Sequence, residues 1–284
     1  MLVDALRGAV RLVRPSNALV SAAATYVGYA VAAAPLPPGF PAAPLLAAMA
    51  ASVAFTAAGN IRNDLGDVDI DRAAHPDRPL VTGAMTPRAA RVLAIAAYAA
   101  AVVAAWLVSW AALALVLVAI PLMEGYEQWG KGRGLPGNLL IALLTMAPFV
   151  IGGLAAQHVG PALLALAGLA ALATLAREVI KDIQDADADA GARRTFVHRV
   201  GAVAAGRLAR GALLAAVLLS PAPWALESVL GATYLAAIIP ADVAFVLAAQ
   251  KAVAQPRRAQ QFAKLGMVAA LLAILVGRTF GAPP

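Results

Sequence analysis

The chain has 284 residues, of which 62% are hydrophobic and only 13% are charged. A soluble domain usually contains about 45–50% apolar and about 25% charged residues, so this composition excludes a soluble domain and also a disordered chain. The absence of cysteine excludes a disulfide scaffold. What remains is an all-α, polytopic membrane protein. Its net charge of +7 is expected to reflect Lys and Arg in cytoplasmic loops rather than a nucleic-acid partner.

Apolar residues are gathered into long stretches separated by polar loops. A helix needs about 20 apolar residues to cross the hydrocarbon core of a bilayer. The stretches that approach this length are 16–35, 42–62, 89–108, 110–125, 137–156, 161–181, 201–220, 226–249 and 263–280. We therefore predict about nine transmembrane helices in a single domain, 1–284. The number falls to eight if the third and fourth stretches, divided only near Ser109, form one span.

The first residues allow two interpretations. Apolar residues on one side of 1–14 predict an amphipathic helix on the membrane surface; they are Leu2, Val3, Leu6, Val10 and Val13. The basic residues, the apolar run and the letters VAAAP near residue 31 would also suit a cleaved signal peptide. The length of that run and the presence of eight later spans favour a retained first span.

Basic residues predict the orientation of the chain in the membrane. With the N-terminus inside and the loops alternating, every Lys and Arg except Arg278 falls on the inner side. This asymmetry predicts an N-in, C-out topology. Trp106, Trp110 and Trp224 fall at the predicted outer boundary, where an aromatic belt is expected.

Acidic residues form two groups at the inner ends of the second and sixth spans. We name them the first Asp triad, which is Asp64, Asp67 and Asp71, and the second Asp triad, which is Asp182, Asp185 and Asp189. Each triad is spaced i, i+3, i+7, which places its members on one helical face. The alternative is two solvated loops. Since carboxylates so placed repel one another without a cation, we expect Mg²⁺ to be held there against a diphosphate.

Motifs around both triads carry a family resemblance. GNIRNDLGDVDIDRAAHPDRPLVTG contains NDxxDxxxD, REVIKDIQDADAD contains DxxDxxxD, and RLVRPSNAL and GLPGNLLIALLT precede the first span and open the fifth. Over essentially the whole chain these motifs resemble UbiA-type intramembrane prenyltransferases. The resemblance implies Mg²⁺-dependent transfer of a polyprenyl group from its diphosphate to an acceptor. It also implies that both triads bind diphosphate through Mg²⁺, that Asn63 helps to position metal or diphosphate, and that the helices surround a central cavity.

Residues near the triads are candidates for binding the substrates. Their side chains can contact phosphate or cap the site, and they are Arg62, Arg72, Arg78, Tyr126, Lys131 and Lys181. Ordinary inner-side cations, and an interfacial aromatic in the case of Tyr126, are the alternatives. Asp242 lies alone inside the eighth span, with either a structural or a substrate role. His75, His158 and His198 show no metal-site spacing.

The acceptor is indicated by two short motifs. DRAAHPDRPLVTG and REVIKD are similar to stretches of the archaeal digeranylgeranylglyceryl phosphate synthases, with departures at His75 and at Val81 and Thr82. This resemblance favours geranylgeranyl diphosphate as donor and geranylgeranylglyceryl phosphate, a lipid-like acceptor, in archaeal ether-lipid synthesis at the cell membrane. The expected active site opens toward the cytoplasm, among membrane lipids. The alternatives are an aromatic acceptor of the hydroxybenzoate, quinone or chlorophyll type and, outside enzymes, a cation transporter.

Overall fold

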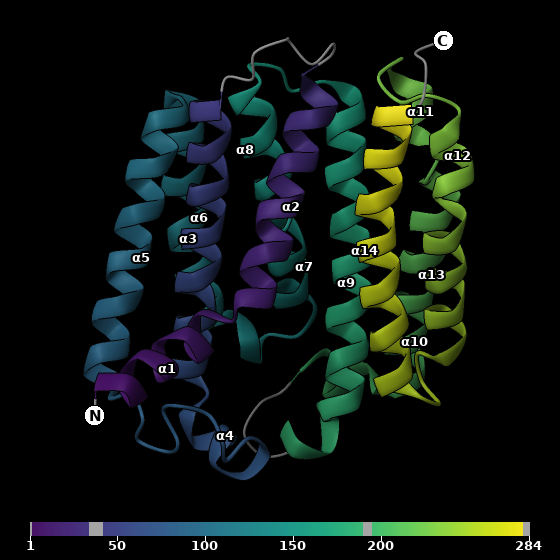
Figure 1. The fold of residues 1–284 in the computed structure, drawn as a ribbon. Helices are drawn as coiled ribbons and strands as arrows, with labels where there is room; N and C mark the ends of the chain where they lie inside the picture. Colours follow the sequence, from purple (N-terminus) through teal and green to yellow (C-terminus); the bar gives the residue numbers. More distant parts are fainter. Residues whose placement is uncertain (1, 34–41, 190–194, 281–284) are drawn as a thin grey trace.

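The computed structural model describes residues 2–33, 42–189 and 195–280. All regular secondary structure in these ranges is helical, and the long helices stand side by side in a bundle (Figure 1). The first half contains α1 (Leu2–Val13), α2 (Pro15–Ala32), α3 (Ala42–Gly66), α4 (Val68–Ala74), α5 (Pro87–Val108) and α6 (Trp110–Gln128). The all-helical membrane fold predicted from composition is therefore confirmed.

The second half of the chain is more broken. It contains the 3₁₀ turn η1 (Gly130–Gly132), α7 (Leu135–Leu144), α8 (Ala147–Ala155), α9 (Pro161–Asp189), α10 (Phe196–Leu219), α11 (Ala222–Leu226), α12 (Thr233–Ala237), α13 (Ile239–Lys251) and α14 (Pro256–Phe280). The predicted spans 137–156 and 226–249 are each divided between two helices. Pro148 and Pro240 stand in the first turn of α8 and α13, where a residue without a backbone N–H begins a helix but cannot continue one.

Eight helical segments in the described ranges are long and apolar enough to cross a membrane, and the chain is a multi-pass membrane protein. The sequence predicts about nine spans, and the difference from eight arises at the first one. Its helix, α2, begins with Pro15, Ser16 and Asn17 and falls short of that standard; residues 34 and 35 of the predicted span lie outside the described ranges. The third and fourth spans remain separate, because Ser109 ends α5 and its Oγ caps α6 by accepting from the N–H of Ala112 at 3.1 Å.

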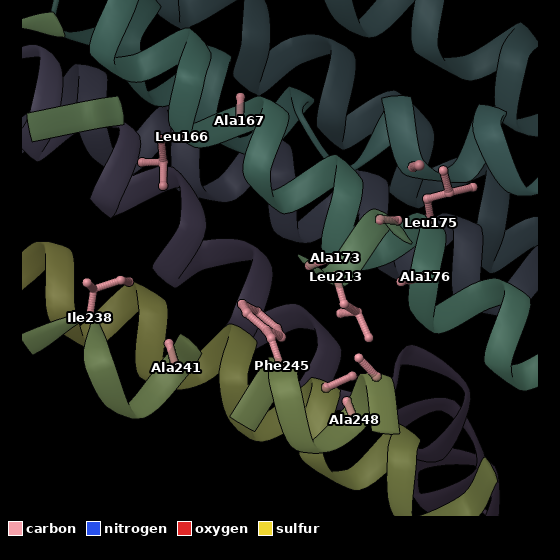
Figure 2. Close-up of a cluster of buried hydrophobic side chains, with 14 of the residues drawn as sticks. Leu166, Ala167, Ala173, Leu175, Ala176, Leu213, Ile238, Ala241, Phe245 and Ala248 are labelled. Carbon is pink, nitrogen blue, oxygen red and sulfur yellow. The ribbon is translucent and has the colours of Figure 1, made fainter. Parts of the chain in front are cut away.

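Small residues set the distances between helices. A Cβ atom placed on Gly28 of α2 would overlap the carbonyl oxygen of Phe149 on α8. One placed on Gly152 of α8 would overlap the carbonyl oxygen of Thr25. Glycine is therefore required on both helices for this close approach, as is common between helices in lipid. The main core follows the same pattern, with alanines such as Ala173 filling the space between larger side chains from α9, α10 and α13 (Figure 2).

The short helices α1 and α4 lie at one end of the bundle (Figure 1). Arg14, between α1 and α2, has a positive φ of 53°, which ends α1 and lets α2 start at a new angle. Leu12 of α1 is fully buried in a small core with Ile61 of α3, whereas Leu6 is 66% exposed. This arrangement fits the predicted surface helix; the side chains of Leu2 and Val3 lie outside the described residues.

Candidate active site

A cavity of about 720 Å³ lies inside the bundle. On α9 its lining runs from Leu166 to Lys181, about four helical turns. The wall is mainly apolar, but charged and polar side chains gather where the cavity approaches α4 and η1. This polar end includes Arg14, Asn63, Tyr126, Glu127, Arg177, Glu178, Lys181 and Lys264. Three predicted site residues, Asn63, Tyr126 and Lys181, therefore share one end of a single cavity.

The first Asp triad does not lie on one continuous helix. The helix α3 ends at Gly66 and α4 begins at Val68, so that Asp67 stands at the break with φ −106° and ψ 6°. Gly66 favours the end of a helix, and aspartate favours the residue before a new one. The N–H of Asp71 still donates to the carbonyl of Asp67 at 2.8 Å, so the members of the triad remain stacked across the break.

Two arginines neutralise the buried members of this triad. The side chains of Asp64 and Asp71 are 4% and 5% exposed. Arg78 Nη1 donates to Asp64 Oδ1 at 3.0 Å and also pairs with Asp71 Oδ2, while Arg14 pairs with Asp64 from the junction of α1 and α2. Burial raises the pKa of the Asp71 carboxyl and Arg78 opposes that shift. Buried carboxylates need such partners, and Arg14 was not among the predicted residues.

Lys131 holds the third member of the triad. Its Nζ lies 3.2 Å from both carboxylate oxygens of Asp67 and 2.6 Å from Glu127 Oε2. Asn63 Nδ2 donates to Asp67 Oδ2 at 3.0 Å. The interpretation of Lys131 and Asn63 as neighbours of the triad is therefore matched by their positions. Glu127 was not predicted, although its spacing of four residues from Lys131 is the usual one for an ion pair on a helix.

The second Asp triad stands on one uninterrupted helix, since α9 continues to Asp189. Asn138 of α7, itself buried, donates to Asp182 Oδ2 at 2.9 Å. Gln184 Nε2 donates to Asp185 Oδ1 at 3.3 Å, and the side chain of Asp189 lies outside the described residues. Asn138 falls inside the motif GLPGNLLIALLT, but its distance along the chain from the Asp triads gave no reason to predict it as a site residue.

Two predicted substrate contacts lie apart from this cluster. Arg62 binds Glu124 through two nitrogens, with Nη2 2.6 Å from Oε2, and Tyr98 donates to the same carboxylate at 3.0 Å. Arg72 is 69% exposed and lies 3.4 Å from Asp69. Both arginines therefore have carboxylate partners outside the two triads.

A smaller pocket of about 400 Å³ adjoins the first triad. Its charged and polar lining is Arg11, Arg14, Asp64, His75, Asp77 and Arg78. Arg14 lines both this pocket and the central cavity, so the two spaces are neighbours. We name it the basic pocket, because its cations outnumber its carboxylates.

The side chains around the polar end include donors that could bind a metal. In the described part of the chain no three His, Asp or Glu side chains stand close enough to hold a metal ion. The carboxylates of the first triad are instead paired with Arg14, Arg78 and Lys131. Their chemistry, buried carboxylate and amide oxygen at the end of a cavity, nevertheless suits Mg²⁺. His158 and His198 lie elsewhere, paired with Glu227 and with Thr195.

Comparison with known sequences gives a consistent result. The model of the UbiA prenyltransferase family matches residues 21–275. The digeranylgeranylglyceryl phosphate synthase of Natronomonas pharaonis is 36% identical, over 97% of this chain and 98% of its own length. That of Halobacterium salinarum (strain R1) is 39% identical, over 96% of this chain and 97% of its own length.

Solved structures share the fold. The apo structure of a UbiA homologue from Aeropyrum pernix K1 matches with a TM-score of 0.78 and 24% identity, over 93% of this chain and 97% of that one. A UbiA homologue from Archaeoglobus fulgidus, bound to GPP and Mg²⁺, matches with a TM-score of 0.64 and 14% identity, over 96% of this chain and 99% of that one. At these identities the likeness concerns the arrangement of the helices.

Proposed function

Because the chain belongs to the UbiA prenyltransferase family, we propose that this prenyltransferase transfers a geranylgeranyl group from its diphosphate to geranylgeranylglyceryl phosphate. The observation that carries the proposal is the 36–39% identity to synthases of that name over nearly the whole chain. In this reaction the C–O bond to diphosphate breaks, the acceptor hydroxyl oxygen forms the new C–O bond, and its proton is lost. Digeranylgeranylglyceryl phosphate and diphosphate are the products.

The donor is proposed to lie in the central cavity. Its hydrocarbon chain would occupy the apolar wall, where water is excluded from the reacting carbon. Its diphosphate would face Lys181 and Asn63 at the polar end, beside Lys131, which contacts Asp67. We propose that the two Asp triads hold Mg²⁺, as the donor set suits and as the bound Mg²⁺ of the Archaeoglobus fulgidus homologue supports. When bound, Mg²⁺ neutralises charge on the leaving diphosphate.

The acceptor is proposed to place its phosphate in the basic pocket. Arg11, His75 and Arg78 line this pocket, and arginine can bind phosphate through two nitrogens. Arg14 lines both spaces, so a phosphate held there would keep the attached glycerol near the polar end of the cavity. Arg62 and Arg72 remain predicted substrate contacts, although neither is among the residues that line these two spaces. The site is proposed to open to the cytoplasm at the cell membrane, on the charge asymmetry of the loops.

A direct test compares acceptors with one donor. Purified protein in detergent, with Mg²⁺ and labelled geranylgeranyl diphosphate, should form a doubly prenylated product from geranylgeranylglyceryl phosphate. It should form none from 4-hydroxybenzoate. Product from the aromatic acceptor alone would replace the proposed acceptor while leaving prenyl transfer in place. Omission of the acceptor gives the background rate of donor hydrolysis.

A further inference from the structure

The central cavity contains a second polar group far from the Asp triads. Asp242, on α13, accepts a hydrogen bond from Ser220 Oγ at 2.9 Å, and Tyr234 OH donates to the carbonyl of Ser220 at 2.6 Å. All three residues line the cavity. Ser220 and Tyr234 are 5% and 1% exposed, so this is a built polar group inside the bundle.

Its position is the end of the cavity remote from the diphosphate. Ser220 directly follows α10, which is kinked at Gly201 (φ 81°, ψ 157°), and the straight part of this helix, 202–219, is about 27 Å long. The other end of α10, at Phe196, contacts Gly134 beside η1, where a Cβ on Gly134 would lie 3.1 Å from Phe196 Cα. On α9 the lining from Leu166 to Lys181 measures about 22 Å. An extended chain of four isoprene units is about as long as this wall.

One oxygen of Asp242 has no hydrogen-bond partner. Oδ1 is buried and, within the described ranges, receives no donor. The cavity lining on and near α13 also includes the apolar side chains of Ile238 and Phe245. A polar atom buried against hydrocarbon without a partner is unfavourable. The end of the cavity at Asp242 therefore disfavours contact with hydrocarbon, whereas the apolar wall favours it.

We propose that Asp242 limits the length of the prenyl donor. A chain that ends short of Asp242 leaves its partly exposed side chain facing an open, water-accessible part of the cavity, whereas a longer chain would cover that side chain with hydrocarbon, which can neither donate nor accept a hydrogen bond. The limit is set by polarity more than by space. Ser220 is a positioning residue, because its hydroxyl donates to Oδ2 and thereby fixes the side chain of Asp242 in the cavity wall. The inference rests on the proposed prenyl diphosphate donor and adds the basis of its chain-length selection.

The test is competitive binding, which needs no acceptor. Labelled geranylgeranyl diphosphate, bound to the full-length protein with Mg²⁺, is displaced by the unlabelled C20 diphosphate or by the C25 homologue. In the native protein C20 should bind more tightly. In Asp242→Val, which is similar in size, the preference should move toward C25 by about tenfold, or about 1.4 kcal/mol. Asp242→Asn keeps a polar floor and should retain the native preference.

A matched control changes polarity elsewhere in the same cavity. Thr174 is buried in the wall and its hydroxyl accepts from Thr145 Oγ1 at 3.3 Å, so Thr174→Val removes a satisfied hydroxyl at nearly constant shape. Its C20 to C25 preference should be native. Thermal unfolding of each variant confirms that the binding data refer to folded protein.

The outcomes separate this inference from the proposed function. An unchanged preference in a folded Asp242→Val, or an equal change in Asp242→Asn, would overturn the chain-length role of the carboxyl. A native protein that selects C20 and responds to Asp242→Val, yet fails to prenylate the lipid acceptor, would instead remove the proposed acceptor. A negative result in the binding assay and a negative result in the transfer assay therefore bear on different proposals.

Discussion

Arg78 Nη1 lies 3.0 Å from Asp64 Oδ1, although the two residues belong to different segments on either side of α4. Asp64 is buried at the end of α3, and Arg78 follows α4. The same nitrogen pairs with Asp71, so one guanidinium spans two members of the first Asp triad. The folded protein therefore already needs positive charge beside Asp64 and Asp71.

The first prediction concerns stability without and with Mg²⁺. Arg78→Ala leaves two buried carboxylates short of a partner, which should lower the free energy of unfolding by about 1–3 kcal/mol. If Mg²⁺ binds the first Asp triad, it can supply the missing positive charge. Its addition should then raise the Tm of Arg78→Ala more than that of the native protein. Equal Tm shifts in both proteins would argue against Mg²⁺ at this triad.

The second prediction concerns the Asp triads in catalysis. Asp67→Asn and Asp182→Asn should each lower kcat at least about 100-fold, because electrostatic stabilisation of a leaving group contributes several kcal/mol. Asp69→Asn is the matched control, since Asp69 lies in α4 but is 90% exposed. It should retain native activity. Excess EDTA should abolish turnover and Mg²⁺ should restore it; full activity in EDTA would contradict the metal assignment.

Much of the fold could be predicted because hydropathy acts locally. The long helices α9, α10 and α14 follow from long apolar runs, and the second Asp triad follows from its spacing on α9. The breaks were harder to predict. The end of α3 at Gly66 and the division at Thr145 between α7 and α8 depend on the single residues Gly66 and Pro148, whose effect a hydropathy pattern alone does not show.

The partners of the site residues were the least predictable part. Asp64 meets Arg14 from 50 residues away, and Asp182 meets Asn138 from 44 residues away. Such contacts arise only when α2, α3, α7 and α9 are assembled. The motifs RLVRPSNAL and GLPGNLLIALLT did contain Arg14 and Asn138, so family resemblance pointed to the correct segments before geometry could give the residues a role.

The third prediction concerns topology. The chain has no cysteine, so single cysteines can be introduced without background. The Asp69→Cys variant carries its thiol near the Asp triads and should react with an impermeant thiol reagent only after the membrane is opened. Val159 lies in the loop before α9 and is 37% exposed, so the Val159→Cys variant should react in intact cells. Labelling of Asp69→Cys but not of Val159→Cys in intact cells would reverse the predicted N-in orientation.

The fourth prediction tests the basic pocket by comparing two arginines of α1. Arg11 lines the pocket, whereas Arg7 is exposed one turn earlier and does not line it. A charge-assisted contact to phosphate contributes roughly 1.5–3 kcal/mol. Arg11→Ala should therefore raise the KM for geranylgeranylglyceryl phosphate by about 10- to 150-fold. Arg7→Ala should change it little.

The same variants distinguish the two anionic groups that could use this pocket. If Arg11 serves the acceptor phosphate, its loss should leave the KM for geranylgeranyl diphosphate nearly native, because the Asp triads and Lys131 serve the donor. The measurement is the KM for each substrate at a saturating concentration of the other. Equal increases for both substrates would assign the basic pocket to the diphosphate. The acceptor phosphate would then have to bind elsewhere, with Arg72 as a remaining predicted contact.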